Sequence, residues 1–338
     1  MKRQFRKLCP AVLLWMAMLA GAFGSVLGQN RLTAPTLDAR SRGLGGISAS
    51  TGESPVALLW NPANLALLRR PVFSMNMNRV FTYNQVGVSD FRPQIGALGI
   101  VAGRLVAGMI GDFAAFGWAR PLGAGLAAGA NLLFTKNAAG RWDGDFGIGA
   151  AWQPAANSYA MSSFPASLRL FVSFLHLGRS SKSGLVPLFL LGTSLDFWQG
   201  KLRWYSEGQV SRHSGRWLNG IEFQPLRQIT LRLGIPELKI QDFAWGIGLN
   251  AGSFRLDIAY DSEQKRIQAT QNILFGREPR QRAKQLYSEG IALLKRKEFL
   301  QAEKKFRSAL NFDPDNTNYT QIYRKVRNFI QQRKIEEQ

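Results

Sequence analysis

A period-two alternation of side chains runs through residues 72–275 and constrains the fold more than any other feature of the sequence. In residues 228–235 and 254–260, every second side chain is apolar, and those between are mostly polar or small. The same pattern recurs in residues 145–152, with glycine and alanine between the apolar positions. Such alternation predicts β-strands that have one apolar face. Residues 72–275 are therefore expected to form an all-β unit.

The alternating segments number about fourteen. Their length, roughly 8 to 12 residues, suits tilted strands that cross a bilayer. Residues typical of turns separate them, such as Arg120-Pro121 and Gln153-Pro154. The expected strands are 72–80, 82–91, 95–103, 112–120, 125–136, 142–152, 166–176, 186–197, 201–212, 216–224, 228–235, 243–251, 252–260 and 266–275.

The chain begins with basic residues, followed by an apolar run over residues 8–23 and then by small residues. This order predicts a secretory signal peptide over residues 1–28, with cleavage before Gln29; a retained N-terminal anchor is the alternative. Cys9 is the only cysteine and lies inside this signal. The mature chain would then have no disulfide and no thiolate metal site.

Two architectures fit the alternation, a transmembrane barrel and a soluble β-sandwich. The signal peptide and the unbroken series of strands favour the barrel. Aromatic residues near strand ends favour it too, because membrane barrels carry aromatic girdles at both interfaces. We therefore expect a barrel in the outer membrane of a bacterium. The aromatic residues concerned are Trp118, Trp142, Trp152, Trp198 and Trp217.

The formal net charge of +21 bears on the choice of partner. A nucleic-acid-binding protein clusters its basic residues on one element together with aromatic residues. Here the basic residues are scattered between the expected strands, so nucleic acid is not expected as a partner. Contact with anionic head groups of outer-membrane lipids, or simple solubility of the loops, explains the charge better.

After Gly276 the pattern becomes helical and the density of charge rises. We interpret residues 280–338 as a module that resembles one tetratricopeptide repeat followed by a helix over residues 319–335. A plain amphipathic tail is the alternative. One repeat is short for independent stability, so we expect the module to dock on the barrel rim, on another copy or on a partner. The expected packing positions are Gly290, Ala302, Phe306, Ala309 and Pro314.

No arrangement of residues in the sequence indicates an enzyme. His176 and His213 are the only histidines, and neither belongs to a pair with metal-ligand spacing. We expect His176 to continue the lipid-facing side of its strand and His213 to lie in a turn. Asp143 and Asp145 share a strand face, but a lumenal or loop position explains them without catalysis. No metal and no cofactor are expected.

Residues 29–71 lie between the signal and the first strand, and they carry a short motif. Gly45-Gly46 and Ala49 precede Ala57 and the sequence Trp60-Asn61-Pro62-Ala63, with Leu65 two residues later. This segment resembles the N-terminal segment of the outer-membrane barrel superfamily that contains FadL-like transporters and the PorV and PorQ proteins of type IX secretion. The resemblance spans residues 39–275. The chain departs from that family at Asn64, where glycine is usual, and at Thr51-Gly52-Glu53-Ser54, where acidic residues are usual.

The resemblance implies a fourteen-stranded barrel whose segment 29–71 folds into the lumen as a hatch. A lumenal position also follows from the need of backbone N–H and C=O groups for hydrogen-bond partners, because irregular backbone at membrane depth must lie inside the protein. By the same resemblance, Asn61, Pro62 and Ala63 contribute to the passage of hydrophobic ligands. Trp60, Gly45 and Gly46 are the other residues of the motif that the resemblance assigns to the hatch. The alternative is that these residues only plug and anchor the barrel.

Three functions remain open at this stage. The interpretation we favour is a non-enzymatic protein that resembles PorV and PorQ and acts in protein secretion or surface assembly. In that case the helical module would lie in the periplasm and contact periplasmic or secretion-complex proteins. The second is a FadL-like transporter of hydrophobic small molecules, and the third is a structural outer-membrane protein.

Overall fold

The computed structural model describes residues 37–336, apart from short gaps in turns and loops. The predicted signal peptide and the first residues of the predicted hatch lie outside the described part of the chain. The gaps are residues 53, 69, 78–82, 93–94, 105–109, 124, 138, 154–166, 179–186, 213, 238–241, 263–264, 276–278 and 314–315.

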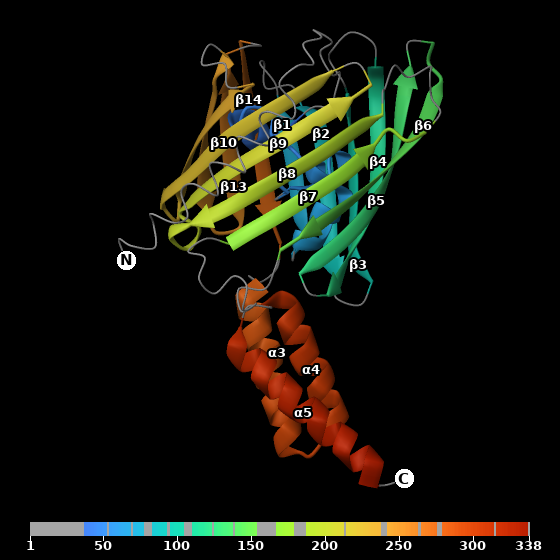
Figure 1. The fold of residues 1–338 in the computed structure, drawn as a ribbon, viewed down its shortest axis with the longest axis vertical. Coiled ribbons are helices and arrows are strands. Elements are labelled where there is room, and N and C mark those ends of the chain that lie inside the picture. The colour runs from blue at the N-terminus through green and yellow to red at the C-terminus, as the bar shows by residue number, and fades with distance from the viewer. Residues whose placement is uncertain are drawn as a thin grey trace.

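Fourteen antiparallel strands form one closed barrel, as the alternation predicts (Figure 1). Each strand pairs with its neighbours in sequence, and β1 (Val72–Met77) closes the barrel against β14 (Arg266–Leu274). The remaining strands are β2 (Tyr83–Arg92), β3 (Gly96–Arg104), β4 (Ile110–Gly123), β5 (Leu126–Asn137), β6 (Trp142–Trp152), β7 (Ser167–Leu175), β8 (Leu188–Phe197), β9 (Leu202–Ser211), β10 (Gly215–Leu226), β11 (Ile229–Pro236), β12 (Ala244–Ala251) and β13 (Phe254–Asp261).

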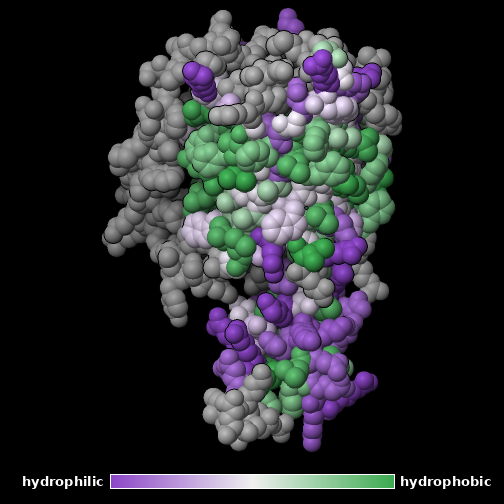
Figure 2. Space-filling model, turned by 90° about the vertical axis from the view of Figure 1, so that its right-hand side faces the viewer, coloured by the Kyte–Doolittle hydropathy of each residue, from purple (hydrophilic) through white to green (hydrophobic). Residues whose placement is uncertain are grey.

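The outward face of the barrel is apolar, and Figure 2 shows it as a hydrophobic band above a hydrophilic helical module. Large side chains such as Ile100, Leu132 and Trp245 are exposed on this face. Trp118, Trp142, Trp152 and Trp198 are also exposed, in agreement with the predicted aromatic girdles. An exposed band of this size is the surface of a barrel that lies in a lipid bilayer.

The inward face differs between the two halves of the barrel. On β3 to β6 it consists largely of glycine and alanine, including Gly117, Gly129 and Ala151. On β7 to β14 it carries buried polar and charged side chains, including Glu222 and Arg232. The lumen therefore has an apolar half and a polar half.

Residues 37–68, here called the lumenal segment, lie inside the barrel (Figure 1). The segment contains a short helix α2 (Ala39–Gly43) and two 3-10 helices, η1 (Pro55–Leu59) and η2 (Pro62–Leu67). Pro55 and Pro62 begin the two 3-10 helices, where their missing N–H groups cost nothing. A third 3-10 helix, η3 (Trp198–Gly200), lies in the turn between β8 and β9.

Three helices follow the barrel: α3 (Pro279–Lys295), α4 (Phe299–Phe312) and α5 (Thr317–Glu336). Ala302 and Phe306 are fully buried between them and pack with Val326 of α5. Gly290 brings α3 close to the Phe306 ring, while Pro314 lies outside the described residues. None of the helices in the described chain is long and apolar enough to cross a membrane.

The helical module contacts the barrel at the end where β1 begins and β14 finishes. Phe312 of α4 lies edge-on to Phe91 of β2, with ring centroids 6.0 Å apart. Ala309 and Tyr319 belong to the same hydrophobic cluster as Phe91 and Phe312. The module is thus packed against one mouth of the barrel, called here the module-side mouth.

Close packing at Gly290 gives a testable prediction. A Cβ atom at this position would lie 2.7 Å from the buried Phe306 ring, so Gly290→Val should destabilise the module by about 1–3 kcal/mol through overpacking. The measurement is the thermal loss of helical circular dichroism in the full chain. Ser288→Val, at an exposed position of the same helix, is the control. Equal melting of both variants would contradict the prediction.

Candidate functional site in the barrel lumen

The lumenal segment contacts nearly the whole inner wall, but with different parts on different sides. Helix α2 contacts β11 to β14, whereas η1 and η2 contact β1 to β6. The first part of the segment therefore lies in the polar half of the lumen, and the second part lies in the apolar half.

Arg40 anchors the first part to the wall. Its guanidinium group makes a two-pronged contact with Glu222 of β10, with N–O distances of 3.0 and 2.8 Å. It also donates to the hydroxyl of Tyr205 at 2.9 Å and to the carbonyl oxygen of Thr51 at 3.2 Å. Arg40 is 3% exposed, so this charge-assisted contact is shielded from water.

Glu222 is one member of a row of charges on the inner wall. Nε of Arg232 on β11 donates to the Glu222 carboxylate at 2.8 Å. Nη1 of the same arginine lies 2.8 Å from Oδ1 of Asp257 on β13. Every acidic member of the row contacts at least two arginines, so each buried carboxylate is well neutralised. In order around the wall the row consists of Arg169, Asp196, Arg203, Glu222, Arg232, Asp257 and Arg255.

Glu207 of β9 forms a second anchor, and this one uses neutral donors. The backbone N–H groups of Ser48 and Ala49 donate to its carboxylate, the latter at 2.8 Å. The Ser48 hydroxyl and the Gln209 amide donate to it at 3.1 and 2.8 Å. Glu207 is fully buried, so it fixes the backbone of the lumenal segment where no regular secondary structure does.

Asp38 folds the segment back on itself. Its carboxylate accepts from the backbone N–H of Ser41 at 2.8 Å, which caps helix α2. The other oxygen accepts from the hydroxyl of Ser54 at 2.7 Å. Residues 38 and 54 are thus joined at the point where the segment crosses from the polar half to the apolar half.

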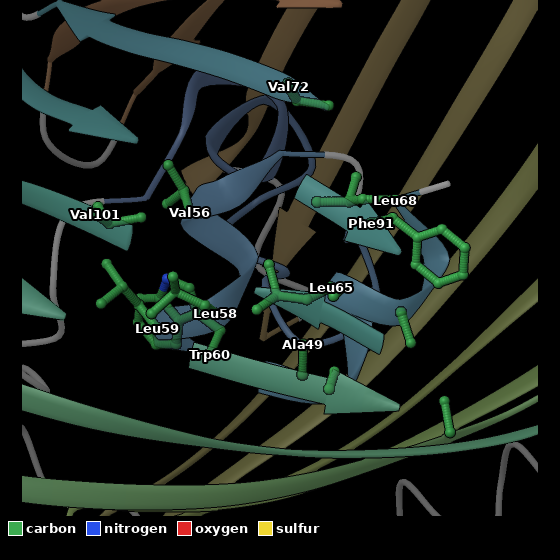
Figure 3. Close-up of a cluster of buried hydrophobic side chains, with 14 of the residues drawn as sticks. Ala49, Val56, Leu58, Leu59, Trp60, Leu65, Leu68, Val72, Phe91 and Val101 are labelled. Carbon is green, nitrogen blue, oxygen red and sulfur yellow. The ribbon is translucent and has the colours of Figure 1, made fainter. Parts of the chain in front are cut away.

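In the apolar half, the segment is held by close packing of its apolar side chains against the barrel wall. Leu58 and Leu65 are fully buried, and Figure 3 shows them among the side chains of one hydrophobic cluster. The wall is made of small residues because the segment lies directly against it. A Cβ atom at Gly129 would lie 2.6 Å from the carbonyl carbon of Pro62, so a larger residue there would displace η2.

The motif residues predicted from the sequence lie together in this half. Asn61 begins η2, where its side-chain oxygen accepts from the N–H of Ala63 and its amide donates to the carbonyl of Ala150 on β6 at 3.2 Å. Pro62 faces the wall, and Ala63 is fully buried against Ala151 and Phe171.

Trp60 is 3% exposed, and its indole N–H has no acceptor among the described residues. Gly45 and Gly46 lie apart from the Asn61–Ala63 group, close to the polar wall. Both have positive φ angles, 76° and 94°, which favour glycine. Gly45 passes within van der Waals range of the backbone of Gly234 on β11. These two glycines therefore turn the chain against the wall.

The prediction for His176 is wrong. The sequence places it on the lipid-facing side of β7, but the strand ends at Leu175 and His176 has a φ of 57°. This left-handed turn directs the ring to Asp145, whose carboxylate lies 2.8 Å from Nδ1. The backbone N–H of Gly178 donates to the same carboxylate at 2.7 Å. His176 and Asp145 therefore fasten the chain that follows β7 to β6; His213 lies outside the described residues.

Sequence reasoning missed the anchors Arg40, Glu207 and Glu222. The alternation places Glu207 and Glu222 on the inward face of their strands. It does not indicate which segment of the chain contacts them. Within the described chain no group of three or more histidine, cysteine or acidic residues could hold a metal ion.

No family model matches the sequence, and no curated protein matches it. Solved structures similar to the chain include the CymD monoaromatic hydrocarbon channel, with 11% identity, a TM-score of 0.48, and coverage of 73% of this chain and 99% of that one. A Pseudomonas aeruginosa FadL homologue has 10% identity and a TM-score of 0.44, and the match covers 71% of this chain and 97% of the homologue. The Pseudomonas putida toluene transporter TodX has 11% identity and a TM-score of 0.45, and the match covers 72% of this chain and 98% of TodX. Likenesses at this level assign neither a family nor a substrate to this chain.

The Arg40 anchor gives a second prediction. Arg40→Ala removes the ion pair that joins the segment to Glu222, together with the hydrogen bonds to Tyr205 and Thr51. Glu222 keeps Arg203 and Arg232, so the loss should be smaller than the about 3–5 kcal/mol of a buried charge left without any partner. Residues 37–52 should then exchange backbone hydrogens much faster in the intact barrel, as measured by mass spectrometry.

Arg92→Ala is the matched control, since Arg92 pairs with Asp90 on the surface with its side chain 71% exposed. An exposed pair of this kind contributes about 0–1 kcal/mol. Similar exchange in the two variants would show that Arg40 does not anchor the segment.

Proposed function

We propose that this chain is an outer-membrane barrel through which hydrophobic small molecules pass, with the lumenal segment as a hatch. The observation that carries the proposal is the division of the lumen. The anchors Arg40 and Glu207 hold residues 38–49 through an ion pair and hydrogen bonds, whereas residues 55–67 fill the apolar half. A hydrophobic molecule would pass between η1, η2 and the wall formed by β3 to β6.

The apolar half suits passage because its contacts can be replaced by a substrate. Packing of Leu58 and Leu65 against the small wall residues is non-directional, so an apolar molecule can take its place with little loss. Hydrogen bonds between described residues that tie this part of the segment to the wall run from Asn61 to the carbonyl of Ala150 and from Asn131 of β5 to the carbonyl of Leu58.

The anchored half, in contrast, suits retention. Separating Arg40 from Glu222 would break a two-pronged, buried ion pair and the hydrogen bond from Arg40 to Tyr205, which opposes movement of this part of the segment. The hatch would therefore open at η1 and η2 while residues 38–49 stay in place. In this arrangement Asn61, Pro62 and Ala63 lie beside the passage, whereas Gly45 and Gly46 belong to the fixed part.

The proposed orientation places the helical module in the periplasm. An even number of strands brings Val72 and Leu274 to the same end of the barrel, where they pair. Most connections at that end are short turns, such as those after Leu226 and Ala251, and the one long connection there is residues 153–166 between β6 and β7. Short turns are characteristic of the periplasmic end of bacterial outer-membrane barrels.

A pair of tethers tests the proposed passage. Leu58→Cys with Asn131→Cys would tie the apolar half of the hatch to β5, whereas Ala39→Cys with Thr270→Cys would tie the anchored half to β14. Both are made with Cys9 replaced by serine. In liposomes, thiol crosslinking of the first pair should stop entry of an alkylarene or fatty-acid probe, and reduction should restore it.

Crosslinking of the second pair should leave probe entry unchanged, because that contact is not expected to move. Entry that persists through the first tether, or that stops with the second, would refute the proposed route.

A second candidate function, in protein secretion or surface assembly, is favoured by the helical module. Leu300 of α4 is 59% exposed and Phe329 of α5 is 40% exposed, which suits a surface that contacts another protein. If this function holds, deletion of residues 280–338 should change the set of periplasmic and outer-membrane proteins crosslinked to the barrel in native membranes. An unchanged set would exclude the module as the contact.

A further inference from the structure

The hydrophobic cluster of the apolar half continues out of the barrel into the helical module. Leu68 ends the lumenal segment, and Figure 3 shows it beside Phe91 at the end of β2. Phe91 belongs to the inward-facing series of β2, since Val86 and Val88 face outward and are exposed. On its far side Phe91 meets Phe312 of α4. The route proposed above therefore ends, on the module side, at a side chain from a different part of the protein.

Phe312 is enclosed from both directions. Its ring lies edge-on to Phe91 at 79°, and the guanidinium carbon of Arg282 in α3 lies 4.6 Å from the ring centroid. Only 2% of Phe312 is exposed, and Phe91 is 3% exposed. The contact between barrel and module thus contributes to hiding two large aromatic side chains from water.

We infer that Phe312 closes the module-side mouth of the passage and that the helical module is its lid. This inference rests on the proposed function for the identity of the route, but the closure itself can be tested without it. A hydrophobic molecule that leaves the apolar half on this side must displace Phe312, so movement of the module controls release.

The contact has the chemistry of a lid that opens. The Phe91–Phe312 pair is apolar, so separating it breaks no hydrogen bond and no ion pair of those two side chains. The rings would instead be covered by the departing hydrophobic molecule. Helix α3 begins at Pro279, five residues after β14 ends at Leu274, so the module stays beside the mouth when it moves.

Access to the mouth tests the closure directly. Leu68→Cys is introduced with Cys9→Ser, and a bulky water-soluble maleimide is added from the module side of the reconstituted full chain. Phe312→Ala should speed labelling of residue 68 about tenfold, as expected for the loss of an aromatic pair and its buried area. Phe329→Ala, the same change at the exposed end of the module, should leave the labelling rate unchanged.

A reversible tether tests whether the lid controls passage. Phe91→Cys with Phe312→Cys, joined by a short thiol crosslinker, should stop probe movement until the tether is reduced. Phe299→Cys with Phe329→Cys, whose rings lie 4.7 Å apart within the module and outside the cluster of Phe312, is the control tether and should have no effect.

The outcomes separate the two proposals. No probe movement even in the untethered chain would refute the proposed function, while faster labelling in Phe312→Ala would still support the closure. Unchanged labelling in Phe312→Ala would overturn the closure. A third outcome would combine faster labelling in Phe312→Ala with probe movement that continues when Phe91→Cys and Phe312→Cys are crosslinked. That outcome would overturn the role of the module as a lid on this route.

Discussion

Closure of β1 on β14 is the interaction on which the rest of the structure depends. In a bilayer, every backbone N–H and C=O group of a spanning strand needs a partner within the protein. The register from Val72 with Leu274 to Met77 with Ala269 supplies partners to both end strands, so the sheet has no edge. Once the sheet is closed, successive side chains must face either the lipid or the lumen, and in this chain residues 37–68 occupy the lumen.

The lumen is filled in two ways that differ in physical character. On β3 to β6 small wall residues leave room, and Leu58 and Leu65 occupy it through packing. On β7 to β13 the wall carries its own charges, and the lumenal segment joins them through Arg40. Packing tolerates replacement by another apolar surface, whereas a buried ion pair does not tolerate the loss of a partner. In the proposed function, this difference separates the part of the segment that moves from the part that holds it.

The sequence predicts the wall better than the contents of the lumen. The strands can be predicted from the alternation because every second side chain of a spanning strand faces lipid and must be apolar. This requirement acts within each strand, so it is visible in the local sequence. The contact of Arg40 with Glu222 joins residues 182 positions apart, and nothing local indicates it. Likewise, the φ of 57° at His176 ends the alternation one residue early and reverses the direction of its side chain. The motif from Trp60 to Ala63 could be found because proline and asparagine have local roles at the start of η2.

The helical module resolves a problem that the divided lumen creates. The proposed passage, lined with apolar side chains, would expose them to water at the module-side mouth. Phe312 covers it from outside the barrel, with its own ring enclosed by Phe91 and Arg282. Phe312 belongs to the module, and the Arg40 anchor belongs to the lumenal segment. In the function and closure proposed here, retention of the hatch and opening of the mouth therefore depend on different parts of the chain.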